Sequence, residues 1–291
     1  MDNFAVFILT HGRADNVKTY KTLKDCGYTG KIYLLVDNFD KQINLYKKIY
    51  GNQVIVFDKQ KAIDMTDSGD NQQKHNSVVY ARNYNFIVAK ELNIDYFLQL
   101  DDDYNTFEFS IDENLDYFGH KKIKDLNAVC NAFVNYLKQS KIKSIAFAQG
   151  GDFIGGEGAA IIAKFNKGEI PRKVMNAFFF ATDNPVKFMG RINEDVNLYV
   201  TNGLKGDVFA THHAVRIEQM PTQQNGGGLT DIYLDLGTYV KSFYSVIYAP
   251  SCVKIKMMGV TERRFHHSIK WNNAVPKIID QKFKKNYGSH T

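Results

Sequence analysis

Three consecutive aspartates, Asp101, Asp102 and Asp103, follow directly after the apolar segment 96–100. Adjacent carboxylates repel one another, so such a run is favoured where a strand ends in a cleft and a cation neutralises the charge. Mg2+ and Mn2+ prefer carboxylate oxygens, and bound phosphates usually complete their coordination. Because alternate side chains of an extended segment share a face, Asp101 and Asp103 are predicted to point into one metal site and Asp102 elsewhere. A solvated acidic turn is the alternative interpretation.

Basic side chains gather towards the end of the chain. They are Lys254, Lys256, Arg263, Arg264, Lys270, Lys277, Lys282, Lys284 and Lys285. The formal net charge of +6 is compatible with a polyanionic partner but too small to establish one. A solvated basic tail and a contact with phosphate or nucleic acid are both open interpretations.

The composition is ordinary for a soluble globular protein, with 44% hydrophobic and 23% charged residues among 291. No apolar run reaches the roughly 18 residues of a spanning helix, and the first residues lack the basic region of a signal peptide, so no membrane partner is expected. Cys26, Cys130 and Cys252 are far apart and show no disulfide or metal-binding spacing. This cysteine usage fits a reducing cytoplasm.

Strand and helix patterns alternate over the first hundred residues. Strands are predicted at 5–9, 32–36, 54–57 and 96–100, and helices at 16–26, 41–50 and 77–92. This alternation predicts an α/β fold with a largely parallel central sheet, in which ligands bind beyond the carboxyl ends of the strands. The residues at those ends are Thr10, His11, Gly12, Arg13, Asp37, Asp58 and the three aspartates. Aspartates at strand ends also simply form turns.

The second half of the chain is less regular. The polar segment 59–76 is predicted to be a surface loop over the ligand. Helices are predicted at 124–139, 194–203 and 232–243, strands at 144–149, 176–181, 207–217, 253–257 and 265–271, and glycine-rich loops at 150–158 and 223–228. The loop 150–158 lacks the lysine and threonine of a P-loop, which argues against an NTPase. We expect one domain over 1–291, with a nucleotide-sugar half at 1–105 and an acceptor half at 106–291.

The order of these motifs resembles the glycosyltransferases of the A fold. A Thr-x-Gly-Arg loop follows the first strand, two further strands end in Asp, and an Ala-Arg-Asn helix precedes the strand into Asp-x-Asp. The segment 189–195 also resembles the Glu-Asp motif that opens a helix in inverting members. The resemblance implies a single-domain GT-A-like fold and metal-dependent sugar transfer, with Mn2+ or Mg2+ and a nucleotide-sugar donor, expected to be a UDP-sugar.

A narrower resemblance is to the TET-associated glycosyltransferases of bacteriophages. It is carried by 190–196, by Gly226–Gly228 with Asp231 and Tyr233, and by 263–277. This resemblance implies DNA with 5-hydroxymethyl pyrimidines as the acceptor, and the cytoplasm of an infected bacterial cell as the location. Arg263, Arg264 and Lys270 would then contact DNA phosphates.

The resemblance also implies roles for individual residues. Asp103 would ligate the metal, and Asp101 would contact sugar or ribose directly or through the ion. Asp195, beside Glu194, would be the general base, because displacement at a sugar carbon needs a carboxylate opposite the leaving group. The predicted donor-binding residues are Thr10, Gly12, Arg13, Asp37, Asp58, Arg82, Asn83, Asp101 and Arg191. One of His266 and His267 would complete the metal site.

Each of these roles has an ordinary structural alternative. Acidic residues such as Glu194 and Asp195 are favoured at a helix N-terminus by the helix dipole alone. Arg82 and Asn83 could lie on an exposed helix surface, and any single histidine is more often a packed side chain than a ligand. Arg191 could pair with Asp195 instead of a phosphate.

Three other functions remain open from the sequence. A glycosyltransferase acting on a cell-surface glycan or protein would not bind DNA. A metal-dependent nucleotidyltransferase would release pyrophosphate, because paired carboxylates also serve two-metal chemistry. A DNA-binding module without catalysis would be indifferent to the loss of Asp103.

Overall fold

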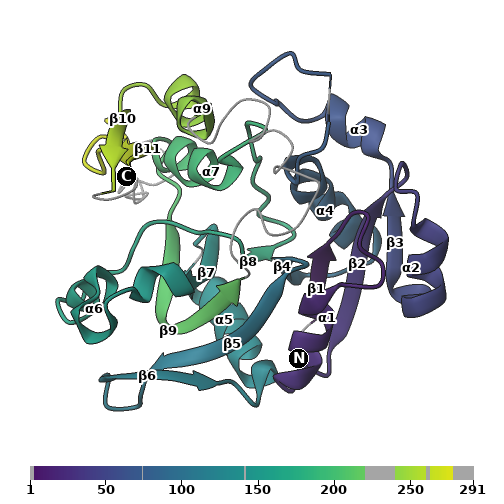
Figure 1. Cartoon of the computed structure of the whole chain (residues 1–291), viewed down its shortest axis with the longest axis horizontal. Coiled ribbons are helices and arrows are strands. Elements are labelled where there is room, and N and C mark those ends of the chain that lie inside the picture. Colours follow the sequence, from purple (N-terminus) through teal and green to yellow (C-terminus); the bar gives the residue numbers. More distant parts are fainter. Residues whose placement is uncertain (1–2, 74, 141, 220–239, 260–262, 278–291) are drawn as a thin grey trace, which may run out of the picture.

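The computed structural model describes residues 3–73, 75–140, 142–219, 240–259 and 263–277, and its centre is a nine-stranded sheet (Figure 1). The strand order is β3-β2-β1-β4-β8-β7-β9-β5-β6. These strands are β1 (Phe4–Leu9), β2 (Lys31–Asp37), β3 (Val54–Phe57), β4 (Tyr96–Asp101), β5 (Tyr104–Ile111), β6 (Tyr117–Lys122), β7 (Ser144–Gln149), β8 (Phe178–Ala181) and β9 (Phe209–Gln219). A separate antiparallel ribbon pairs β10 (Val253–Met258) with β11 (Arg264–Ile269).

The helices flank this sheet on both faces. They are α1 (Lys18–Asp25), α2 (Ile43–Tyr50), α3 (Lys59–Asp64), α4 (Val79–Glu91), α5 (Leu126–Ser140), α6 (Ala160–Phe165), α7 (Glu194–Gly203) and α9 (Val240–Tyr248), with short 3-10 turns η1 (Gly51–Gln53), η2 (Gly150–Phe153) and η3 (Gly156–Gly158). Within the described ranges, no helix is long and apolar enough to cross a membrane.

The sheet is mostly parallel, which confirms the predicted α/β class. Strands β1 to β4 run in one direction, and in the whole sheet only β5 and β8 oppose the others. Leu9 lies opposite Asp101, and Asp37 lies opposite Phe57. The loops that follow these four strands therefore open at the same edge of the sheet.

The core explains why β1 is a continuous apolar run. Every residue of β1 is buried. Its alternate side chains enter two different clusters: Phe4, Val6 and Ile8 pack on the face of α1 and α5, whereas Ala5 and Phe7 pack on the face of α4. A strand covered on both faces needs apolar residues at every position, not only at every second one.

Several elements differ from the sequence-based prediction. The segment expected to be a surface loop from residue 59 begins with α3, because Asp58 caps that helix by accepting a hydrogen bond from the Lys61 amide at 3.1 Å. The hairpin β5–β6 and helix α6 were not predicted. The helix expected at 232–243 is seen as α9 from residue 240 onwards, whereas the loop 223–228, Asp231 and Tyr233 lie outside the described residues.

Candidate active site

The middle aspartate of the triplet holds the loop after β1. Asp102 is buried and accepts hydrogen bonds from Thr10 Oγ1 at 2.7 Å and from Arg13 Nη1 at 2.8 Å. The hydroxyl of Tyr46, from α2, lies 2.9 Å from Thr10 Oγ1 and accepts from the Arg13 amide. Burial raises the pKa of Asp102, and Arg13 and Thr10 oppose that shift. Thr10 and Arg13, both predicted to bind the donor, are therefore tied to the triplet itself.

A single buried guanidinium connects the first aspartate to α7. Arg82, from the first turn of α4, is only 1% exposed. Its Nη2 donates to both carboxylate oxygens of Asp101, at 3.1 and 3.3 Å, and its Nε donates to Glu194 Oε1 at 3.1 Å. Its planar group lies 4.8 Å from the ring centroid of Phe178 and 5.8 Å from that of Phe188. Arg82 thus joins the carboxyl end of β4 to the amino end of α7.

The third aspartate, Asp103, lies close to the other acidic side chains of the triplet, and little positive charge neutralises it. Burial and the neighbouring charge of Asp101 raise the pKa of Asp103 to about 6, although Gln219 Nε2 donates to its Oδ1 at 3.1 Å. A carboxylate with a raised pKa lacks countercharge, and a divalent cation would supply it. Two carboxylates with substrate phosphates are the usual ligand set for Mg2+, so Asp101 and Asp103 fit this group of metals. Within the described ranges, no three or more His, Cys, Asp and Glu side chains form a metal cluster.

The first two residues of α7, Glu194 and Asp195, are both acidic, and their surroundings differ. Asn193 precedes the helix in the left-handed conformation at φ 55°, and its side chain makes no capping hydrogen bond. Its Nδ2 donates instead to the backbone oxygen of Lys241 at 2.9 Å. Glu194 is buried against Arg82, whereas Asp195 is half-buried and accepts from the Val196 amide at 2.7 Å. Burial raises the pKa of both carboxyls. Asp195 is therefore the one of the two that an acceptor can approach.

The ends of β2 and β3 carry the other predicted donor residues. Asp37 is buried and pairs with His11 Nδ1 at 2.7 Å and Lys59 Nζ at 3.3 Å. Burial raises the pKa of Asp37, but His11 and Lys59 outweigh it and hold that pKa below its ordinary value. Gly12, at φ 68°, donates its amide to Asp40 at 2.6 Å. Asp58 caps α3 and remains half-buried at the same edge.

A family model described as TET-Associated Glycosyltransferase matches residues 4–228. The chain belongs to the TET-associated glycosyltransferase family. The protein is therefore a glycosyltransferase, as the sequence resemblance implied, and the predicted GT-A-like α/β fold agrees with the mostly parallel sheet. A search of curated proteins gives no match.

Solved structures with a similar arrangement include other enzymes of sugar and nucleotide transfer. The glucosyl-3-phosphoglycerate synthase from Mycobacterium tuberculosis, in complex with Mn2+, UDP and phosphoglyceric acid, is 10% identical with a TM-score of 0.45, over 91% of this chain and 86% of that one. S. aureus TarS is 12% identical with a TM-score of 0.43, over 84% and 39%. A cytidylyltransferase from Leptospira borgpetersenii is 13% identical with a TM-score of 0.32, over 63% and 62%. Likenesses this distant carry no argument about donor, metal or acceptor.

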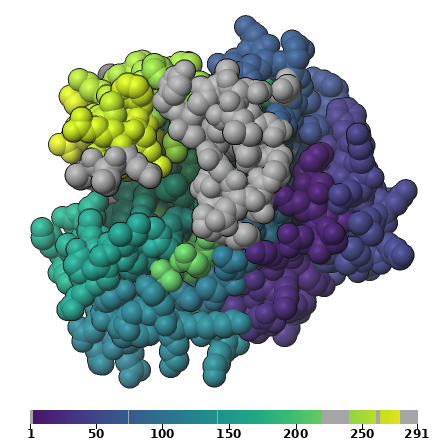
Figure 2. Space-filling model, in the orientation of Figure 1, coloured from purple at the N-terminus to yellow at the C-terminus, as the bar shows by residue number. Residues whose placement is uncertain are grey.

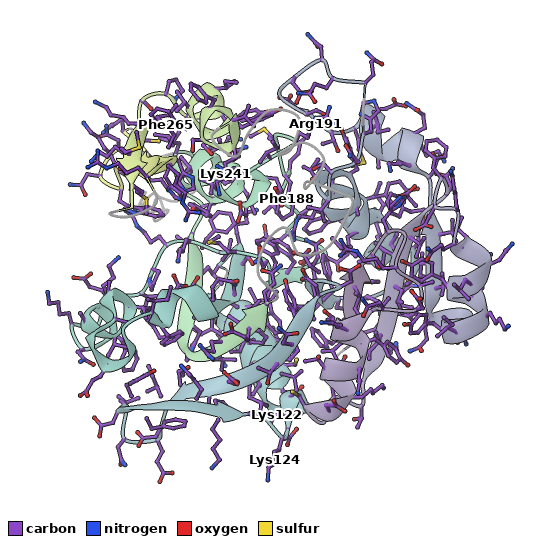
Figure 3. All side chains as sticks on the ribbon, in the orientation of Figure 1. Lys122, Lys124, Phe188, Arg191, Lys241 and Phe265 are labelled. Carbon is purple, nitrogen blue, oxygen red and sulfur yellow. The ribbon has the colours of Figure 1, made fainter. Side chains whose placement is uncertain are left out.

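Two of the predicted donor residues in this glycosyltransferase hold neighbouring loops. The amide of Asn83 donates to Thr66 Oγ1 and to the Phe188 backbone oxygen, both at 3.0 Å, and its carbonyl accepts from the Phe188 amide at 2.8 Å. Arg191 is fully buried and pairs with Asp70 at 2.8 Å (Figure 3). The pairing of Arg191 with Asp195, which was one alternative interpretation, is therefore not seen, because Asp70 from the loop after α3 is its carboxylate partner.

The two late histidines lie beside α7. His267 Nδ1 accepts a hydrogen bond from Asn193 Nδ2 at 3.2 Å, and His266 donates from Nδ1 to the His267 backbone oxygen at 2.8 Å. Burial, with the nearby charge of Lys241, lowers the pKa of His267 to about 4, so its ring is neutral at physiological pH. Neither histidine has a hydrogen bond or ion pair with an aspartate of the triplet in the part of the chain described. Their role as metal ligands stays a prediction.

Two residues of the site were missed from the sequence. Gln219 donates to Asp103 and also accepts from Asn176 Nδ2 at 2.8 Å. The predicted strand stopped at 217, although β9 extends to Gln219. Asp70, the partner of Arg191, also accepts a hydrogen bond from the Tyr244 hydroxyl of α9. No local pattern marks Asp70, because its partners are far away in sequence.

The raised pKa of Asp103 predicts a pH-dependent stability in metal-free buffer. A carboxyl whose pKa rises from 3.8 to about 6 on folding stabilises the fold below about pH 4, and this contribution is lost as the pH rises through 6. Asp103→Asn should therefore become more stable than the wild type, by on the order of 2 kcal/mol, as the pH rises from about 4 to 7. Urea unfolding across this range, with the exposed Asp116→Asn as control, measures the difference. If the difference in free energy of unfolding between Asp103→Asn and the wild type does not change with pH, the pKa of Asp103 is not raised in the folded protein.

Proposed function

We propose that the protein transfers a sugar from a nucleotide-diphosphate donor, a UDP-sugar, onto 5-hydroxymethyl pyrimidines in phage DNA, with Mn2+ or Mg2+ as cofactor. The observation that carries the proposal is the bridge from Asp101 through Arg82 to Glu194. This bridge brings the strand end that suits a metal and a diphosphate next to the helix that carries an accessible carboxylate. The family match supports sugar transfer as the reaction.

In the proposed reaction, Asp195 accepts the proton of the acceptor hydroxyl. That oxygen forms a bond to the anomeric carbon of the sugar while the bond from this carbon to the diphosphate oxygen breaks. The nucleoside diphosphate leaves with the electron pair. A single displacement with the base opposite the leaving group inverts the anomeric configuration, so we propose an inverting transfer. The raised pKa of Asp195 suits a base that must take up a proton near neutral pH.

On the donor side, Asp103 and Asp101 would hold the cation. When bound, a divalent ion neutralises the diphosphate and stabilises the departing nucleotide. Asp102 keeps the loop 10–13 against this strand end, where Gly12 lets its backbone come close to a ligand. Asp37 and Asp58 stand at the neighbouring strand ends, within the same edge of the sheet, and we assign them to the nucleoside.

The acceptor side of the proposal rests on the later part of the chain. Arg263, Arg264 and Lys270 are exposed on or beside β11, where they can meet DNA phosphates. The ribbon of β10 and β11 forms the yellow part of the surface in Figure 2. Cys26, Cys130 and Cys252 are free and buried, which suits the cytoplasm of an infected bacterial cell. We propose that residues 1–291 act as one domain, with 1–105 binding the donor and 106–291 serving the acceptor.

Release of nucleoside diphosphate tests the proposed reaction as a whole. With Mn2+ and a UDP-sugar, DNA containing 5-hydroxymethylcytosine or 5-hydroxymethyluracil should stimulate release of UDP. EDTA should abolish this release, and Mn2+ should restore it. Asp103→Ala should lose it, whereas the exposed control Asp116→Asn should keep it. Release that is stimulated by a glycan or a protein but never by hydroxymethylated DNA would reject the acceptor. Release of pyrophosphate from a nucleotide would reject the reaction class.

Replacement of Asp195, the proposed base, should slow the chemical step and leave the affinity for the donor unchanged. Asp195→Asn should lower the rate constant for transfer about 10²- to 10⁴-fold, which is the usual contribution of general base catalysis. The affinity for UDP, measured by isothermal titration with Mn2+, should stay close to that of the wild type. An Asp195→Asn enzyme that transfers sugar at the wild-type rate would contradict this role.

A further inference from the structure

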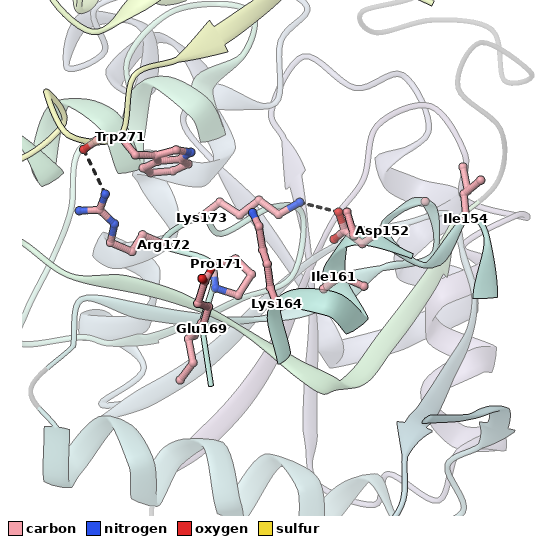
Figure 4. A pocket seen from close by; sticks show the side chains of 12 residues that line it. Asp152, Ile154, Ile161, Lys164, Glu169, Pro171, Arg172, Lys173 and Trp271 are labelled. Carbon is pink, nitrogen blue, oxygen red and sulfur yellow. Dashed lines mark hydrogen bonds and ion pairs between the residues drawn. The ribbon is translucent and has the colours of Figure 1, made fainter. Parts of the chain in front are cut away.

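A cavity lies on the proposed acceptor side, between α6 and the segment that follows β11. Its volume is about 560 Å³, within the range of about 300–1,000 Å³ that is usual for pockets of small ligands. Its lining includes Ile154, Ile161, Lys164, Arg172, Lys173 and Trp271. Figure 4 shows Trp271 and Arg172 at one end of this lining and Ile154 at the other, with Lys164 and Lys173 between them, and Figure 2 shows the hollow below β10 and β11.

Two of the cationic side chains that line this cavity, Lys164 and Arg172, can bind an anionic group. Lys173 is neutralised by Asp152, with Nζ donating to Oδ1 at 2.6 Å. Lys164 and Arg172 are both exposed. Among the residues that the structure describes, Lys164 has no ion pair, and the hydrogen bond of Arg172 goes to the backbone oxygen of Trp271. The side chain of Glu169 extends away from Lys164 and Arg172 in Figure 4. The cavity therefore offers positive charge to an anionic group.

Trp271 forms the aromatic wall of the cavity, and its contacts with Tyr199 and Arg172 fix the position of its indole. The indole of Trp271 stacks on the ring of Tyr199, with centroids 5.8 Å apart and planes inclined by 20°. The guanidinium of Arg172 lies 5.2 Å from the same indole centroid, and its Nη2 donates to the Trp271 backbone oxygen at 3.0 Å. An indole beside cations is a common surface for a nucleobase with its phosphate.

Tyr199 places this cavity next to the proposed general base. Tyr199 lies on α7, four residues after Asp195, and its ring is buried beneath Trp271. Burial raises the pKa of Tyr199, and the charges of both Asp195 and Asp152 raise it further. Tyr199 thus lies one turn of α7 after the proposed base, and its ring stacks on the indole that lines the cavity. A ligand in this cavity would therefore lie alongside an acceptor that reaches Asp195.

We propose that this cavity binds one unpaired nucleotide of the acceptor strand, adjacent to the nucleotide that receives the sugar. Its base would lie against the edge of the Trp271 indole, because Tyr199 and the Arg172 guanidinium already lie over that ring. Its phosphodiester would contact Lys164 and Arg172. The cavity would take this nucleotide without its pairing partner, so the strand would be unpaired there. This inference rests on the proposed function, because it takes DNA as the acceptor.

The fluorescence of Trp271 tests this proposal directly, because it is the only tryptophan in the chain. A single-stranded oligothymidylate of about ten nucleotides should quench its emission through contact between a base and the indole. The double variant Lys164→Ala/Arg172→Ala should raise the dissociation constant about tenfold. It should also reduce the slope of log affinity against log salt concentration by about 1 to 2, since two phosphate contacts are lost. The matched control Lys47→Ala/Lys48→Ala removes the same charge from α2 and should leave both values unchanged.

Transfer to hydroxymethylated single-stranded DNA separates this proposal from the proposed function. If the double variant raises the KM for the oligonucleotide much more than it lowers kcat, the cavity assignment is supported. If DNA is glycosylated but the double variant has the KM and the salt slope of the control, the proposed function stands and the cavity assignment is wrong. If Trp271 is quenched with the expected loss in the double variant and no DNA is glycosylated, the cavity assignment stands and the proposed acceptor is wrong. Quenching by duplex DNA with equal affinity would overturn the requirement for an unpaired nucleotide.

Discussion

The active-site architecture depends on one buried cation. A guanidinium withdrawn from water must be compensated by carboxylates, because an unpaired buried charge costs several kcal/mol. Arg82 meets this requirement with Asp101 from the end of β4 and Glu194 from the start of α7. These two residues are far apart in sequence, so the ion pairs determine how the sheet edge and the helix are placed relative to each other. Phe178 and Phe188 enclose the cation and exclude water from the pair.

The balance of charge around Arg82 is negative, and this explains what the site can bind. Asp101 and Glu194 pair with this one guanidinium, and each has a further carboxylate close to it in the chain, Asp103 and Asp195 respectively. Burial raises the pKa of Asp103, Glu194 and Asp195. Such a site would repel the diphosphate of a donor unless a cation bound first. The same negative field would stabilise positive charge at a sugar carbon that loses its leaving group.

The sequence predicted the parts of this site that depend on local pattern. The uninterrupted apolar run at β1 and the aspartates at the end of β4 indicated a parallel sheet whose edge binds a ligand, and the structure has that sheet. The pairing of Arg82 with Glu194 and of Arg191 with Asp70 could not be predicted, because each joins residues more than a hundred positions apart. The hairpin β5–β6 was missed because its alternation follows directly on the charged triplet. The role of Asn83 is likewise decided by the distant backbone of Phe188.

A double-mutant cycle between Arg82 and Glu194 tests this central interaction most directly. The free energy of unfolding in urea would be measured for Arg82→Met, for Glu194→Gln and for the double variant at neutral pH. We expect Glu194→Gln to cost less, or to stabilise, once Arg82 is gone, with a coupling energy of about 1 to 3 kcal/mol. If the changes in the free energy of unfolding of the two single variants sum to that of the double variant within about 0.5 kcal/mol, the guanidinium does not join β4 to α7.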